Sequence, residues 1–209
     1  MIQLPQEEII LGNSATYGIH LLANGLSLAS GDEVLLMRND FPSDILPWLF
    51  LKDKGVAVHQ LKGKGPVLTA EDIKAAITLR TKVLCLPYVH TFSGWALDIA
   101  GISKLCRERG ILFIVNMSQA IGAFNVNVGD LGVDAIVCAG YKWMLGPYGT
   151  GFCWIRPQMR KQLQYHQAYW ISLMDEHSLG TTDELVLNTE DSARRYDVFG
   201  TANFFNYVP

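Results

Sequence analysis

Long hydrophobic runs, a surplus of positive charge and a secretion signal are all missing from this sequence of 209 residues. Apolar runs such as 111–115 stop far short of the roughly 20 residues that a membrane-spanning helix needs. The N-terminal segment Met1–Pro5 has neither the charged start nor the apolar stretch of a signal peptide. With 17 Lys and Arg against 20 Asp and Glu, no basic field would attract nucleic acid. We therefore expect a cytoplasmic protein that binds neither a membrane nor a nucleic acid.

Motifs for metal, nucleotide and hydrolase chemistry are also missing. The four cysteines form no C-x-x-C pair, which argues against a zinc knuckle and a disulfide framework. The five histidines show no H-x-x-x-H or H-E-x-x-H spacing, so no metal site is expected. A Walker loop and a G-x-S-x-G elbow are lacking as well. The thiols, expected to be reduced, buried and unsuited to forming a persulfide, are Cys85, Cys106, Cys138 and Cys153.

Short apolar runs alternate with amphipathic stretches, and hydrophobic residues make up 49% of the chain. This alternation predicts an α/β fold, and runs rich in Val, Ile and Leu are typical of strands covered on both faces. The predicted strands are Glu8–Leu11, Glu33–Met37, Val56–Leu61, Val83–Pro87, Ile111–Val115, Ala135–Cys138 and Phe152–Ile155.

Helices are predicted between these strands. One begins at Ala70 behind the capping residue Thr69, and another covers Ile99–Arg109 and stops at Gly110. No repeat or Pro/Ser-rich linker divides the chain. We predict a core domain over residues 1–164, followed by an irregular aromatic tail over 165–209 that packs on the core or at a dimer interface.

Small residues in 12–18 follow a predicted strand and open a predicted helix over 16–29. Backbone N–H groups, the helix dipole and the hydroxyl of Ser14 or Thr16 would suit a phosphate there. The alternative is an ordinary helix cap, which is the more frequent role of Ser or Thr at a strand-to-helix turn.

Lys142 lies between an apolar strand and a loop rich in glycine and proline over 143–151. Tyr141 and Trp143 flank it, and partial desolvation would favour the neutral amine that attacks a carbonyl. The alternative is a lysine that extends to the surface at a strand end. The glycines lack the G-x-G-x-x-G spacing of a dinucleotide site.

Lys142 with its glycine-rich loop, the segment 116–122 upstream and Asp134 between them together resemble the core of the class V aminotransferase family, which includes cysteine desulfurases and kynureninases. The resemblance extends from Glu8 to Asn203. It implies a three-layer fold type I large domain with a mostly parallel seven-stranded sheet. It also implies pyridoxal 5'-phosphate bound at the carboxyl ends of the strands, and a homodimer.

The resemblance assigns a role to each matching residue. Lys142 would form the aldimine with the cofactor and serve as the general base. Ala15 and Thr16 would hold the phosphate, and Phe41 would stack on the pyridine ring in a segment that also brings Asp44 to the cofactor. The residues expected to complete the site are Thr91 in place of a usual asparagine, Gln119 at the phenolic oxygen, Tyr141 at the phosphate, and Gly200 and Thr201 at the partner subunit's phosphate. For Thr91, a simple turn is an equally good alternative.

Asn116 is a departure from the family, which has an aspartate at this position. An aspartate keeps the ring nitrogen protonated, whereas an amide carries no charge and would only donate a hydrogen bond to an unprotonated nitrogen. The substitution predicts weakened carbanion chemistry, and the reversal Asn116→Asp is expected to raise turnover.

The chain is also short for the family, because the N-terminal segment and the C-terminal small domain have no counterpart. Arg194 and Arg195 are expected at the surface or interface rather than as clamps for a substrate carboxylate. The sequence favours a pyridoxal phosphate enzyme acting on a small amino acid as an aminotransferase or a lyase. The alternative is a cofactor-binding relative, or a fragment, with impaired or no catalysis that serves as a regulatory subunit.

Overall fold

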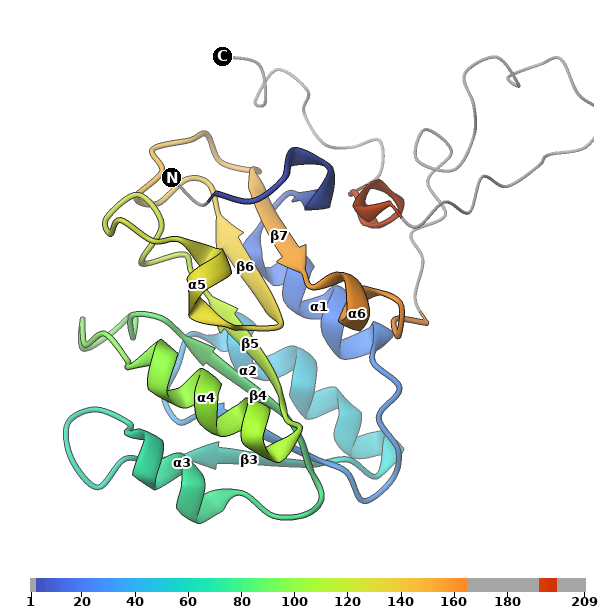
Figure 1. Ribbon diagram of the computed structural model, residues 1–209, viewed down its shortest axis with the longest axis vertical. Coiled ribbons are helices and arrows are strands. Elements are labelled where there is room, and N and C mark those ends of the chain that lie inside the picture. Colours follow the sequence, from blue (N-terminus) through green and yellow to red (C-terminus); the bar gives the residue numbers. More distant parts are fainter. Residues whose placement is uncertain (1–2, 165–191, 199–209) are drawn as a thin grey trace, which may run out of the picture.

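The computed structural model describes residues 3–164 and 192–198, and its centre is one sheet of seven strands (Figure 1). The order across the sheet is β1-β7-β6-β5-β4-β2-β3. Strand β7 runs in the direction opposite to the other six strands. The predicted seven-stranded, mostly parallel sheet is therefore confirmed. The strands are β1 Ile9–Gly12, β2 Glu33–Met37, β3 Ala57–Leu61, β4 Thr81–Pro87, β5 Leu112–Asn116, β6 Ala135–Ala139 and β7 Gly151–Ile155.

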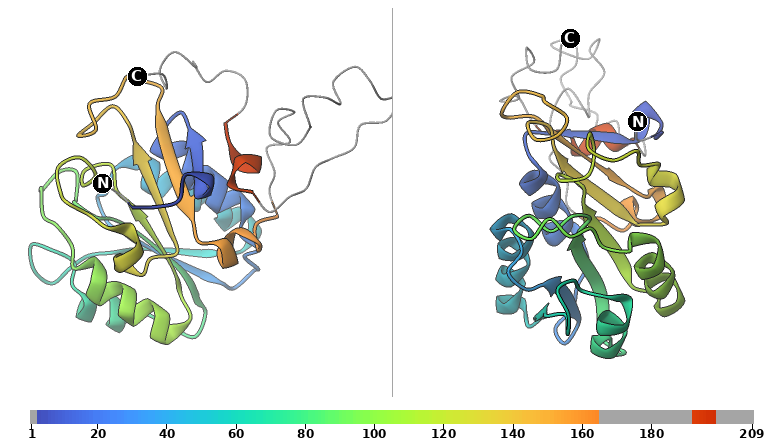
Figure 2. Two further views of the ribbon diagram at one scale, coloured as in Figure 1. Left: turned by 45° about the horizontal axis from the view of Figure 1, so that its top comes forward. Right: turned by 90° about the vertical axis from the view of Figure 1, so that its left-hand side faces the viewer.

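Helices cover both faces of the sheet, which gives the three layers that were expected (Figure 2). One face carries α1 and α2, and the other carries α3, α4 and α5. The helices are α1 Ala15–Gly25, α2 Pro42–Leu49, α3 Ala70–Ala76, α4 Ile99–Arg109, α5 Val128–Leu131 and α6 Pro157–Arg160, with 3-10 turns at Gln6–Glu8, Phe50–Lys54 and Ala193–Tyr196. No helix in the described ranges is long and apolar enough to cross a bilayer.

The helix signals in the sequence operate as expected in α3 and α4. Thr69 and Asp72 form a reciprocal capping box at the start of α3, and Gly110 ends α4 in the left-handed conformation with φ 65°. The prediction of a helix over 16–29 is wrong at its end, because α1 stops at Gly25 and Leu26 is extended. Glycine disfavours helix propagation by about 1 kcal/mol relative to alanine, so the chain leaves the helix there.

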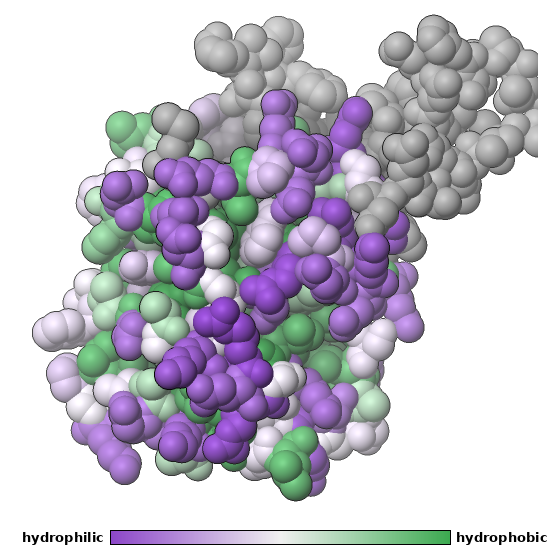
Figure 3. Space-filling model, in the orientation of Figure 1, coloured by the Kyte–Doolittle hydropathy of each residue, from purple (hydrophilic) through white to green (hydrophobic). Residues whose placement is uncertain are grey.

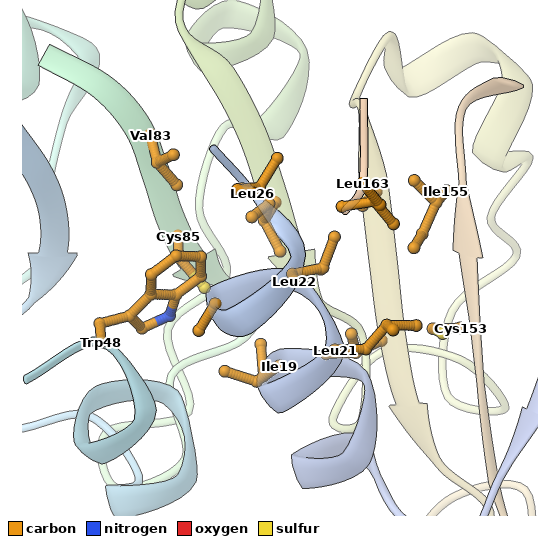
Figure 4. Close-up of a cluster of buried hydrophobic side chains, with 14 of the residues drawn as sticks. Ile19, Leu21, Leu22, Leu26, Trp48, Val83, Cys85, Cys153, Ile155 and Leu163 are labelled. Carbon is orange, nitrogen blue, oxygen red and sulfur yellow. The ribbon is translucent and has the colours of Figure 1, made fainter. Parts of the chain in front are cut away.

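Each face of the sheet has its own hydrophobic core. Beneath α1 and α2, Ile19, Leu22 and Trp48 pack against strand residues that include Cys85 (Figure 4). Hydrophilic side chains cover much of the face that carries α4 (Figure 3). The four cysteines are all free thiols buried in these cores.

The described part of the predicted tail, residues 192–198, packs on the first strand and helix. The Val198 N–H donates to the Leu11 carbonyl, and the Leu11 N–H donates to the Asp197 carboxylate at 2.8 Å. The Tyr17 hydroxyl donates to the Tyr196 carbonyl. The division into a core over 1–164 and a tail stays a prediction, since most of the tail is outside the described residues.

Candidate active site

The predicted site residues follow different strands of the sheet but meet at its carboxyl edge. Parallel strands deliver their following loops to one edge, which is where open α/β sheets bind ligands. Six predicted residues line one small cavity there: Phe41, Asp44, Thr91, Asn116, Gln119 and Lys142. The same cavity is lined by three residues that were not predicted: Pro87, Val89 and Ser118.

Lys142 lies against the ring of Phe41, with Nζ 5.4 Å from the ring centroid. Phe41 precedes α2 and is 39% exposed, so a flat apolar face is presented beside an amine. The loop after Lys142 turns back on β6 through two backbone bonds, from the Gly146 N–H to the Gly140 carbonyl and from the Leu145 N–H to the Lys142 carbonyl. This turn fixes the position of the lysine at the end of the strand.

Asp44 and Asn116 form a buried polar pair across the cavity. The Asn116 Nδ2 group donates to both carboxylate oxygens of Asp44, at 2.8 and 2.9 Å. Asp44 is 3% exposed, and burial raises its pKa to about 7, with the charge of Asp40 raising it further and the bonds from Asn116 and the charge of Lys142 opposing the shift. The Ser118 N–H donates to Asn116 Oδ1 at 2.9 Å, which fixes the orientation of the amide.

Asp40 is a second buried acid, and its charge contributes to the raised pKa of Asp44. Its Oδ1 accepts the Phe41 N–H at 2.8 Å, while Oδ2 has no hydrogen-bond partner within the described residues. Burial raises the pKa of Asp40 to about 6, against the opposing effects of the Phe41 N–H and the charges of His90 and Lys142. The carboxyl edge of the sheet therefore concentrates two carboxyls that the fold alone does not neutralise.

Gln119 and Ser118 connect the loop after β5 to the loop after β6. The Trp143 indole N–H donates to Gln119 Oε1 at 3.0 Å, so the acceptor of this amide is engaged and its NH2 group is the remaining donor. Ser118 Oγ accepts the Ala139 N–H at 2.9 Å. Ser118 was missed because a serine beside a glutamine carries no pattern of its own; only its buried bond to the next strand distinguishes it.

The N-terminus of α1 is capped by Ser14 and is connected to the segment that carries Phe41 and Asp44. Ser14 Oγ accepts the Tyr17 N–H at 3.2 Å, which confirms the capping interpretation. Thr16 Oγ1 donates to Ser43 Oγ at 2.8 Å, which ties α1 to the start of α2. A Cβ on Gly151 would lie 2.8 Å from the Ser14 backbone, so only glycine allows β7 to approach this turn. Ala15 and Thr16 are not among the residues that line the cavity, and the bond to Ser43 connects Thr16 to the segment between Phe41 and Asp44.

Tyr141 is a predicted residue that does not line the cavity. Tyr141 stacks on Tyr148 with ring centroids 4.6 Å apart and packs against the core beneath α1. His90, beside Thr91, is held by Ser93 Oγ at 2.8 Å and the Asn39 carbonyl at 3.0 Å. Gly200 and Thr201 lie outside the described residues.

A larger apolar groove of about 900 Å³ lies beside the loop of Lys142. Ile9, Leu11, Phe124 and Met144 are among its lining residues, and none of the described residues that line it is an acid, a base or a thiol. It therefore lacks the groups for acid–base or nucleophilic chemistry, which are in the smaller cavity.

The cavity fits the cofactor that the resemblance implies. A pyridine ring with an aldehyde, a phenolic oxygen, a ring nitrogen and a phosphate needs a flat apolar face, an amine, a hydrogen-bond donor, a charged partner and an anion-binding helix end. Phe41, Lys142 and Gln119 provide the first three. The buried acid Asp44 and the start of α1 provide the other two.

Comparison with known proteins identifies the family of the chain. Residues 1–177 match the family model of the class V aminotransferases. A probable cysteine desulfurase of Methanothermobacter thermautotrophicus is 29% identical over 164 residues, which cover 78% of this chain and 41% of that protein. A probable cysteine desulfurase of Borreliella burgdorferi is 26% identical over 209 residues, 97% of this chain and 48% of that protein. The chain thus spans less than half the length of these relatives.

Solved structures share the fold. The apo structure of a cysteine desulfurase from Thermococcus onnurineus superposes with a TM-score of 0.85 at 23% identity, covering 98% of this chain and 50% of that one. The cystine C-S lyase C-DES in complex with cysteine persulfide gives a TM-score of 0.85 at 20% identity, over 99% of this chain and 55% of that one. Because the family model matches residues 1–177, which are most of the chain, the chain belongs to the class V aminotransferase family.

Proposed function

We propose that this chain binds pyridoxal 5'-phosphate and acts on a small amino acid, as an aminotransferase or a lyase related to the cysteine desulfurases. The observation that carries the proposal is the position of Lys142, whose Nζ lies over the Phe41 ring in a cavity that also contains a buried acid–amide pair. An amine, an aromatic face and a buried acid at the carboxyl edge of a parallel sheet are the groups that this cofactor requires.

When bound, the cofactor supplies an aldehyde that condenses with amines and a ring that accepts electron density from a substrate carbon. Lys142 Nζ would hold the aldehyde, yield its place to a substrate amine and then carry the α-proton. Phe41 would support one ring face, and the Gln119 NH2 group would donate to the phenolic oxygen. The N-terminus of α1, with Ala15 and Thr16, would bind the phosphate together with Tyr141, and Thr91 would replace the hydrogen bond of the family's asparagine.

The cysteines of the chain bear on which reaction follows. Burial raises the pKa of Cys106 and Cys138 to about 12 in each case, and raises those of Cys85 and Cys153 as well. A thiol must ionise to act as a nucleophile, so these four are unsuited to take up sulfur from a substrate. None of these four thiols is therefore a candidate to carry a persulfide.

A second candidate is a relative that binds the cofactor with impaired or no turnover and serves as a regulatory subunit. Asn116 at the position of the family's aspartate favours it, because an amide brings no charge to the ring. Titration with cysteine, alanine and serine, followed by the visible absorbance of the bound cofactor, separates the two. A band that shifts with an amino acid supports the enzyme, and a band that none of them moves supports the binding subunit.

The deciding experiment is reduction with borohydride followed by peptide mass mapping. We expect the added cofactor mass on Lys142, and complete loss of that adduct in Lys142→Ala. Lys104→Ala, which changes an exposed lysine on α4, is the matched control and should label fully. An adduct that persists in Lys142→Ala, or no adduct in the unaltered protein, would contradict the proposal.

The proposal includes a homodimer in a cytoplasmic setting, with Gly200 and Thr201 of one copy reaching the phosphate of the other. Light scattering of the purified protein tests the oligomeric state. A dimer is the expected result, and a stable monomer that binds the cofactor at full strength would exclude the role given to Thr201.

A further inference from the structure

Asp44 is a buried acid that the described chain leaves without a cation. Within residues 3–164 and 192–198, no Lys, Arg or His nitrogen lies within 4.0 Å of its oxygens, and it is 3% exposed. A buried carboxylate in this situation is costly and is expected to take up a proton or to pair with a cation. Asp44 lines the same cavity as Lys142 and Phe41. A cationic group bound in that cavity would satisfy it.

Asn116 has its amide committed to this acid. Its Oδ1 accepts the Ser118 backbone N–H, so the NH2 group is the end that faces Asp44, and it donates to both carboxylate oxygens. This arrangement differs from the expectation that Asn116 donates directly to an unprotonated ring nitrogen. The geometry makes Asn116 the partner of Asp44, and each carboxylate oxygen keeps a lone pair for a further donor.

We propose that Asp44 replaces the charge that the family carries at position 116, so that Asp44 keeps the ring nitrogen of the bound cofactor protonated while Asn116 orients Asp44. This inference rests on the proposed function. The proton balance is simple: a proton shared between the Asp44 carboxyl and the ring nitrogen stays on the nitrogen, which leaves a carboxylate beside a pyridinium. No other reactant takes part.

The same geometry changes the expectation for Asn116→Asp. A carboxylate at this position would lie within hydrogen-bond distance of Asp44, with Asp40 close behind, and two carboxyls so close share one proton. The pair would then carry no more charge than Asp44 does alone. We therefore expect no gain in turnover from Asn116→Asp unless Asp44 is changed as well.

The test is nitrogen NMR of the protein loaded with cofactor labelled with 15N in the ring, because the chemical shift reports directly whether that nitrogen carries a proton. We expect a protonated nitrogen in the unaltered protein and an unprotonated one in Asp44→Asn. The double variant Asp44→Asn/Asn116→Asp should restore protonation. Asp40→Asn removes an equally buried carboxyl outside the cavity lining and should leave the nitrogen protonated.

A second measurement needs no variant. The cofactor-free protein should bind pyridoxal phosphate about 10- to 100-fold more tightly than an analogue in which carbon replaces the ring nitrogen, as expected for one hydrogen bond to a charged group. Equal affinities, or a nitrogen that stays protonated in Asp44→Asn, overturn the assignment of Asp44 but leave borohydride labelling of Lys142 intact. Failure to label Lys142 overturns the proposed function, and this inference with it.

Discussion

Two buried acids near the two ends of β2 have very different surroundings. Glu33, at the amino end, is 2% exposed and is fully partnered: the Thr78 and Thr81 hydroxyls donate to it at 2.7 and 3.3 Å, and Arg80 forms an ion pair at 2.9 Å. Asp44, beyond the carboxyl end, is equally buried, and within residues 3–164 and 192–198 its carboxylate accepts hydrogen bonds only from the Asn116 amide.

The pKa values of the two acids express this difference. The Thr78 hydroxyl, with Arg80 and Thr81, lowers the pKa of Glu33 despite its burial. Burial raises the pKa of Asp44 to about 7. Within the described residues, the acid at the amino end of the sheet has hydroxyl and guanidinium partners, whereas the acid at the carboxyl end has one amide partner. Comparing partners around buried acids is thus a way to separate structural from functional ones.

The largest effect on stability is expected at the amino end. Glu33→Ala leaves two hydroxyls and Arg80 without their acceptor and should lower the free energy of unfolding by about 2–3 kcal/mol, less than for a fully buried pair because Arg80 is 70% exposed. Urea unfolding of the cofactor-free protein measures it. Asp44→Asn is the matched change at the other end and should not destabilise at pH 8. If Glu33→Ala and Asp44→Asn lowered the free energy of unfolding by equal amounts, the proposed difference between the two acids would be contradicted.

The pH dependence of stability gives the next largest effect. Asp44 in the unfolded chain ionises near pH 4, whereas in the folded protein it holds its proton until about pH 7. The folded protein thus binds more protons in this window, so stability falls as pH rises from about 4 to 7. Asp40, with its pKa of about 6, adds to the fall. Glu33 has the opposite sign, and its contribution is lost only as pH falls through its lowered pKa.

Asp44→Asn should therefore remove part of this decline and gain on the order of 2 kcal/mol over the unaltered protein at pH 8, with no gain near pH 4. Thermal unfolding of cofactor-free protein across this range measures it. A variant whose pH profile is parallel to that of the unaltered protein would show that Asp44 is neutralised by something other than a proton.

The smallest effects come from single hydroxyl groups. Thr78→Val removes one bond to Glu33 and should cost about 1 kcal/mol of stability without affecting the cofactor. Thr16→Val removes the bond to Ser43 at the start of α1, and we expect a loss of about 5-fold in pyridoxal phosphate affinity with little change in stability. Isothermal titration measures the cofactor affinity of both variants, and urea unfolding measures their stability. A loss of affinity in Thr78→Val together with a loss of stability in Thr16→Val would contradict the prediction.

Much of the fold followed from local patterns. All seven predicted strands are present, because runs of Val, Ile and Leu covered on both faces leave few alternatives. Thr69 and Gly110 marked helix ends by their own backbone and capping chemistry. The end of α1 was misplaced because 26–29 continue an apolar pattern, and only the structure shows the chain extended at Leu26.

The residues alone suggested Lys142 and the turn over 12–18, the resemblance supplied the other site residues, and the contacts between them were not predicted. Lys142 and Phe41 meet as expected. The bond between Asn116 and Asp44 joins residues 72 positions apart, and nothing in either local sequence indicates it. An amide in place of an aspartate reads as a loss in the sequence. In the structure, however, the carboxylate of Asp44 lies beside the Asn116 amide.

The loop that carries Lys142 is joined to the loop after β5 at more than one point. Gly122, with φ 95°, lies so close to Trp143 that a Cβ would collide with the Trp143 carbonyl, and the Trp143 indole is bonded to Gln119. These contacts make the two loops one rigid frame around the lysine. Under the proposed function, an incoming amine would displace Lys142 from the cofactor; with the loop held in this way, Lys142 would move by rotation about the bonds of its four methylene groups while its backbone stays in place.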